Sequence, residues 1–156
     1  MDPPRRRVLL SGSSSLAVLL AAALSLPRTA RAQSPYPKAL FDAGTIADLA
    51  RALGSGAPAE SRDVTLTAPD IAEDGANVAI GIASALPSVR RLLLLVEKNP
   101  NLLAAVADIG DSVDAAFSTR IKMAQTSNVY GVAVLADGRM LYARKEVRVT
   151  LGGCGG

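Results

Sequence analysis

Residues 129–151 read VYGVAVLADGRMLYARKEVRVTL, and Asp137-Gly138 divides them into two apolar segments. Asp-Gly between two such segments is a strong signal for a β-hairpin turn. In the second segment Val147, Val149 and Leu151 alternate with charged and polar residues, which is the two-residue period of a strand with one buried face. The stretch therefore predicts a β-hairpin whose second strand leads directly into the C-terminus.

The two-residue period also appears upstream of this hairpin. Val64, Val78 and Phe117 each begin an alternating segment, whereas residues 92–96 are apolar throughout, as expected for a strand covered on both faces. Residues 102–106 fit a helix or a strand equally well. The strands that we expect are 64–68, 78–82, 92–96, 117–123, 129–136 and 140–151. Six or seven short strands with turn signals between them predict an antiparallel β-sandwich of the immunoglobulin type.

One short helix is predicted before the strands. Thr45 and Asp48 have the spacing of a capping box, and apolar residues follow at positions 46, 49, 50 and 53 with helical spacing. Gly54 ends the helix, and an extension back through residues 40 and 41 is compatible with the pattern. The expected fold class is mainly β, an immunoglobulin-like antiparallel β-sandwich over residues 33–151 with a short N-terminal helix and a flexible Gly-rich C-terminal arm.

Residues 1–32 have the features of an export signal. Arg5-Arg6-Arg7 precedes a modestly apolar run, and Ala30-Arg31-Ala32 provides a small-x-small cleavage site. Consecutive arginines before such a run resemble a twin-arginine signal, and the run is too short for a membrane span of about 20 residues. We expect export to the periplasm by this route, cleavage after Ala32 and no membrane anchor. An ordinary secretory signal and an uncleaved leader are the alternatives.

The composition excludes several classes of chemistry. The sequence contains no His and one Cys, so a Ser-His-Asp triad, a Cys-His pair and a His-based zinc site are impossible. The net charge of +3 comes from the leader, because residues 1–32 hold five arginines and one aspartate and the remaining residues carry −1. Without an excess of cations, nucleic-acid binding has no electrostatic basis. We expect no catalytic residues, no metal site and no nucleic-acid partner.

The chain ends in Gly152-Gly153-Cys154-Gly155-Gly156, directly after the last predicted strand. Glycine has no side chain and a permissive backbone, so this segment cannot pack into a core and should be a mobile tether. Fully extended, it places the Cys154 sulfur at most about 10 Å from the strand. An unassisted thiol has a pKa of about 8.5 and is only a few per cent thiolate at pH 7. A thiol that is presented but not activated indicates a carrier on which partner enzymes act.

Other interpretations of this terminus remain open. A lone exposed Cys in an exported chain can form an intermolecular disulfide in a structural or redox module. The glycine tail can also be incidental. In a third interpretation the reactive group is the Gly155-Gly156 carboxylate, as in ubiquitin-like sulfur carriers. Adenylation of that carboxylate needs cytoplasmic ATP, so the export signal argues against this interpretation.

Several segments resemble one family closely. They are residues 98–100 (Lys-Asn-Pro), 118–126, 137–138 and 145–151, which lead into the Gly-Gly-Cys-Gly-Gly terminus. Together with the leader they are similar to SoxY, the sulfur-carrying subunit of the bacterial periplasmic thiosulfate-oxidising Sox system. The resemblance covers essentially all residues after the leader. It implies that Cys154 is the sulfur attachment site and that Gly152, Gly153, Gly155 and Gly156 form the carrier arm.

The resemblance further implies a carrier protein without an enzymatic activity or a cofactor of its own. Sulfur intermediates, a thiosulfonate and a persulfide, would be bound covalently to Cys154. The implied partners are SoxZ, a small β-protein that forms a heterodimer with SoxY, and three transient partners. SoxXA is a c-type cytochrome that conjugates thiosulfate to the Cys, SoxB is a hydrolase that releases sulfate, and SoxCD oxidises the remaining sulfane sulfur in some organisms.

Two further groups of charged residues have less specific patterns. Asp108, Asp111 and Asp114 lie three residues apart, which is compatible with a cation site but more typical of a solvated turn. The pairs Arg90-Arg91 and Arg144-Lys145 are compatible with a positive patch that assists recognition of an anionic adduct. Outward-facing strand residues are the commoner explanation of such pairs.

Overall fold

A computed structural model of the chain describes residues 36–150. The predicted leader and the predicted carrier arm lie outside this range. Within it the chain forms, in order, α2 (Lys38–Phe41), α3 (Ile46–Leu53), β1 (Ala59–Glu60), β2 (Val64–Thr67), β3 (Ile71–Ala72), β4 (Val78–Ser84), β5 (Val89–Val96), β6 (Leu103–Asp108), β7 (Ala116–Ile121), β8 (Ser127–Leu135) and β9 (Met140–Val149). None of the helices in this range is long and apolar enough to cross a membrane.

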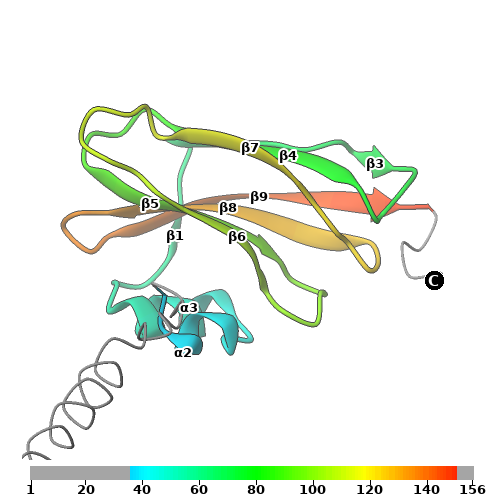
Figure 1. The fold of residues 1–156 in the computed structure, drawn as a ribbon, viewed down its shortest axis with the longest axis horizontal. Coiled ribbons are helices and arrows are strands. Elements are labelled where there is room, and N and C mark those ends of the chain that lie inside the picture. Colours follow the sequence, from blue (N-terminus) through cyan, green and yellow to red (C-terminus); the bar gives the residue numbers. More distant parts are fainter. Residues whose placement is uncertain (1–35, 151–156) are drawn as a thin grey trace, which may run out of the picture. The chain divides into compact units, whose positions relative to one another are not determined.

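The strands form two sheets that pack face to face (Figure 1). One sheet has the order β2-β4-β7, and the other has the order β1-β9-β8-β5-β6 with β3 paired to β9 as well. Every pairing is antiparallel except those of β1 and β3, which run parallel to β9. The predicted β-sandwich is therefore confirmed, and residues 102–106, which fitted either element, belong mostly to a strand.

The larger sheet is buried on both faces. Leu92, Leu94 and Val96 of β5 lie in the core between the two sheets, and Leu93 and Leu95 lie in a second core on the opposite face. All five side chains are fully buried. Because alternate residues of a strand point to opposite faces, a strand with two covered faces must be apolar at every position. This explains the uninterrupted apolar run and confirms the burial that it predicted.

The second core is closed by the helical layer below the larger sheet (Figure 1). Leu49 and Ala50 of α3 are buried against the sheet, as is Leu40 of α2. The Thr45 hydroxyl accepts a hydrogen bond from the Asp48 amide at 3.1 Å and begins α3, and Gly54 ends it in the left-handed conformation at φ 66°. Residues 40 and 41 belong to the separate helix α2, because the extended backbone of Thr45 interrupts the helical path.

Candidate functional site

The base of the predicted carrier arm is the end of β9. The arm itself, residues 152–156 with Cys154, lies outside the described residues. Val147 is fully buried in the core between the sheets and Val149 packs partly against it, whereas Glu146 and Arg148 are exposed. The alternation predicted for this strand is confirmed. The core therefore holds the chain up to a few residues before the arm.

A segment that the sequence did not predict runs along the end of β9. We call residues 68–77, which join β2 to β4, the strap. The strap leaves the three-stranded sheet, pairs through β3 with the end of β9, and returns to β4. The Arg148 amide donates to the Asp70 carbonyl at 3.0 Å, and the Thr150 amide donates to the Ala72 carbonyl at 3.1 Å. A strand of two residues is too short to show a two-residue period, so sequence patterning missed it.

The opposite side of β9 meets the loop between β7 and β8. The Thr126 hydroxyl accepts a hydrogen bond from the Val149 amide at 3.0 Å. The Asn99 side chain joins this loop to the turn after β5, because its amide group donates to the Lys122 carbonyl at 2.7 Å and accepts from the Ala124 amide at 3.1 Å. Three of the segments that carry the sequence resemblance, 98–100, 118–126 and 145–151, thus meet at the base of the arm.

The two basic pairs lie in different places. Arg91 of β5 pairs with Val134 of β8, which in turn pairs with Met140 at the start of β9. Arg91 therefore lies at the opposite end of β9 from Val149. At about 3.3 Å per residue this separation is about 30 Å. Arg91 forms an ion pair with Asp108 at 2.6 Å, and Arg90 forms one with Asp111. Both arginines of the first pair are thus engaged with carboxylates at the end of the sheet remote from Val149.

Of the second pair, Lys145 lies beside the strap. Its ammonium group donates to the Ala68 carbonyl at 2.6 Å and lies 3.0 Å from the Asp70 carboxylate. Arg144, on the opposite face of β9, lies 3.8 Å from the carboxylate of Glu60 in β1. Lys145 is thus the one member of the two basic pairs that contacts the base of the arm.

The three aspartates after β5 do not form a metal site. Asp108 accepts hydrogen bonds from Arg91 and from the Tyr36 hydroxyl, at 2.6 and 2.9 Å, and Asp111 pairs with Arg90. Within residues 36–150 no group of three or more His, Cys, Asp or Glu side chains is placed to hold a metal ion. The Asp108 and Asp111 carboxylates therefore tie the N-terminal segment and the loop after β6 to the larger sheet.

The pKa of Asp108 is shifted by these contacts. Burial raises the pKa, but the hydrogen bonds from Arg91 and Tyr36 and the positive charge of Arg91 outweigh this effect and hold it below the ordinary value of 3.8. The hydrogen bond to Asp108 also raises the pKa of Tyr36 above 10.0. The Arg91 guanidinium lies 5.1 Å from the centre of the Tyr36 ring, which adds a cation–π contact.

Asp108→Asn is expected to remove a pH-dependent part of the stability. A carboxylate whose pKa is lower in the folded state stabilises the fold above its unfolded pKa, and this contribution is lost as the pH falls through the folded-state value. The free energies of unfolding of the wild type and the variant should therefore differ above about pH 5, and the difference should shrink as the pH falls below 3.8 and through the lower folded-state pKa. Urea unfolding of both proteins between these pH values is the measurement. A difference that stays constant down to acid pH would contradict the assignment.

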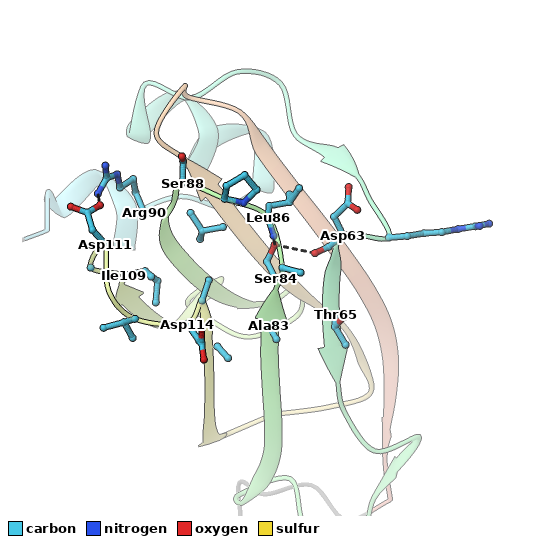
Figure 2. Close-up of a pocket in the computed structure, with 18 residues that line it drawn as sticks. Asp63, Thr65, Ala83, Ser84, Leu86, Ser88, Arg90, Ile109, Asp111 and Asp114 are labelled. Atoms are coloured by element: carbon cyan, nitrogen blue, oxygen red, sulfur yellow. Dashed lines mark hydrogen bonds and ion pairs between the residues drawn. The ribbon is translucent and has the colours of Figure 1, made fainter.

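A cavity lies at the end of the sandwich that is remote from Val149 (Figure 2). It has a volume of about 830 Å³ and is lined by the turn between β4 and β5 and the loop between β6 and β7. Asp63 and Ser84 form one wall, with the Ser84 hydroxyl donating to the Asp63 carbonyl at 2.9 Å, and Arg90 and Asp111 form another (Figure 2). The residues that line this cavity include none from the end of β9.

Comparison with known families gives a match, which extends to Cys154. The family model described as "Sulfur oxidation protein SoxY" matches residues 49–154, which are more than half of the chain and include Cys154. The chain belongs to the SoxY family. The predicted resemblance is thereby confirmed. The SoxY match includes all three segments that meet at the base of the arm and the strap between β2 and β4.

Solved structures agree with this assignment. The sulfur carrier protein SoxY from Chlorobium limicola f thiosulfatophilum is 30% identical, with a TM-score of 0.59, over 66% of this chain and 93% of that chain. A superoxide reductase (neelaredoxin) from Ignicoccus hospitalis has a TM-score of 0.50 at 14% identity, over 55% of this chain and 78% of that chain, which shows a shared fold alone. A search of curated proteins gave no match.

Proposed function

We propose that this SoxY-family chain is a sulfur carrier that holds sulfur intermediates covalently on Cys154 and presents them to partner enzymes. The observation that carries the proposal is the extent of the family match, which runs to Cys154, the one cysteine of the sequence. The solved relative from Chlorobium is named a sulfur carrier protein. The glycines on both sides of Cys154 agree with a thiol that must enter the pocket of another protein.

The geometry at the base of the arm supports a presented thiol. The last described residue, Thr150, is hydrogen-bonded to the strap, and four residues further along the chain is Cys154. Four extended residues span at most about 14 Å. The sequence contains no His that could act as a base for the thiol. Activation must then come from the enzyme that receives the arm, which is the division of labour expected of a carrier.

The chemistry proposed for Cys154 is the oxidative formation of a sulfur–sulfur bond, with loss of the thiol proton, followed by hydrolysis of the sulfonate group. A bond forms between the Cys154 sulfur and the outer sulfur of thiosulfate, and the two electrons that are released pass to a c-type cytochrome partner of the SoxXA kind. Water then cleaves the bond between the outer sulfur and the sulfonate group on a SoxB-like hydrolase. Sulfate leaves, and a persulfide remains on Cys154 for a SoxCD-like enzyme where one is present.

The proposal includes a place and an assembly. The predicted twin-arginine leader and the cleavage site after Ala32 support action in the periplasm. We further propose that the chain works as a heterodimer with a SoxZ-like β-protein. An exported module that uses Cys154 for an intermolecular disulfide is the alternative.

Intact-protein mass spectrometry without reductant tests the proposal. The protein is purified from the periplasm of cells supplied with thiosulfate, and the C-terminal peptide is mapped. Additional sulfur or thiosulfonate on Cys154, removable by reductant and lacking in cells grown without thiosulfate, is the expected result. A bare thiol, or a disulfide-linked dimer as the sole modified form, would reject the carrier and favour the disulfide module.

A further inference from the structure

We propose that the strap is a clamp that fixes where the carrier arm begins, and that Lys145 is the positioning residue that holds this clamp. The inference rests on the proposed carrier function, because the clamp matters for delivery of whatever Cys154 bears. It adds a role for residues outside the terminal motif. Residues 68–77 and Lys145 would determine how many residues separate the last held position from Cys154.

The last three residues of the described chain extend beyond the hairpin that precedes them. The pairing of β8 with β9 ends at Ser127 and Val147. Residues 148–150 therefore have no partner strand in β8. Their amides are held from two sides instead, Arg148 and Thr150 by carbonyls of the strap and Val149 by the Thr126 hydroxyl. Three consecutive amides with partners from two other segments indicate a point of attachment rather than a fraying strand end.

The strap is in turn fixed at both of its ends. Near its start, Lys145 donates to the Ala68 carbonyl and pairs with Asp70, whose own carbonyl accepts from the Arg148 amide. Further along, the Gly75 carbonyl accepts a hydrogen bond from the Met123 amide at 2.7 Å, and the Met123 side chain is buried. Lys145 belongs to β9 itself. It thus joins the strand that leads into the arm to the segment that grips the end of that strand.

The clamp sets the length of the tether. With the clamp closed, Cys154 follows the held Thr150 by four positions. If the strap and the Thr126 hydroxyl both release the end of β9, the next fixed residue is the buried Val147, and seven residues separate it from Cys154. The effective concentration of a tethered group falls roughly as the −3/2 power of tether length, which corresponds to a loss of about two-fold. The maximum reach increases from about 14 Å to about 24 Å.

Amide hydrogen exchange in the full-length chain tests the clamp directly. Lys145→Met keeps the length of the side chain and removes its charge and donors. We expect the amides of Arg148 and Thr150 to exchange about ten-fold faster, with the amides of the β8–β9 ladder unchanged. Arg144→Met, which alters the neighbouring cation without touching the strap, should leave these two amides protected. Lys145→Arg should restore most of the protection.

Equal protection in Lys145→Met and the wild type would overturn the role of Lys145. A uniform acceleration across the whole sheet would also overturn it, because it would mean that Lys145 supports global stability and not the clamp. Exchange at these amides does not depend on sulfur chemistry. If the clamp is found but Cys154 never carries sulfur, the carrier function is rejected and the clamp is retained. If Cys154 carries sulfur but exchange at Arg148 and Thr150 is unchanged in Lys145→Met, only the clamp is rejected.

A second experiment separates positioning from stability. Insertion of Gly-Gly-Gly after Thr150 lengthens the tether and leaves the clamp intact. Both this insertion and Lys145→Met are expected to lower the rate of sulfate release from adduct-loaded protein by about two-fold at low concentrations of the hydrolase. Only Lys145→Met should accelerate exchange at Arg148 and Thr150. An unchanged release rate in Lys145→Met would overturn the positioning role.

Discussion

Cys154→Ser is expected to abolish thiosulfate-dependent sulfate formation and to leave the sandwich intact. The serine oxygen cannot form the sulfur–sulfur bond by which thiosulfate is attached, so no adduct can be made. Position 154 follows the held Thr150 by four residues, and the fully buried residues of the two cores lie within residues 40–147. Thiosulfate-dependent oxygen uptake of cells that carry only the variant is the measurement, with the melting temperature as the test of folding.

Phe41→Ala provides the control for this experiment. Phe41 is 41% exposed on the helical layer, far along the chain from Cys154, and its substitution should leave thiosulfate-dependent uptake at the level of the wild type. Residual activity in Cys154→Ser above that of a strain lacking the protein would contradict the carrier function. A lowered melting temperature in Cys154→Ser would instead point to a structural role of the terminus.

Leu94→Ala is expected to lower the free energy of unfolding by about 2–5 kcal/mol. Leu94 is fully buried in the core between the sheets and lies opposite Gly131 of β8. The core is tight at this point, because a Cβ added at Gly131 would lie 3.0 Å from the Ile82 side chain and 3.2 Å from that of Leu66. Neighbours that are already in close contact cannot move far to fill the cavity that a smaller side chain leaves.

Equilibrium unfolding in urea measures this loss. Val113→Ala is the matched control, since Val113 is an aliphatic residue that is 63% exposed, and its substitution should change the free energy of unfolding by less than about 0.5 kcal/mol. A loss below about 1 kcal/mol in Leu94→Ala would mean that the two sheets repack around the smaller side chain. The packing described here would then be looser than the close contacts at Gly131 indicate.

The features that sequence patterning predicted well are local or strongly periodic. Helix α3 begins at its Thr45 cap and ends at Gly54, because both signals act within a few residues. The hairpin turns at Asp137-Gly138, where Gly138 adopts a φ of 83° that a residue with a side chain rarely takes. None of these needs information from a distant part of the chain.

The features that it missed depend on contacts between distant residues. The strap meets β9 across more than seventy positions of the sequence, through backbone groups that every residue type possesses. The basic pairs Arg90-Arg91 and Arg144-Lys145 look alike in sequence, yet register places the first at the far end of the sheet and Lys145 beside the strap. Register depends on how whole strands align, which no single segment encodes.

For this protein the sequence alone determined the class of fold, the family and the residue that we propose to carry sulfur, because periodicity, turn chemistry and a terminal motif are properties of short segments. Only the tertiary structure decided where the chain is held before that residue. The amides of Arg148, Val149 and Thr150 find their partners in the strap and at Thr126. Backbone hydrogen bonds between remote segments do not depend on side-chain type, so the pattern of residues does not predict them. The contacts at the base of the arm therefore follow only from the folded structure.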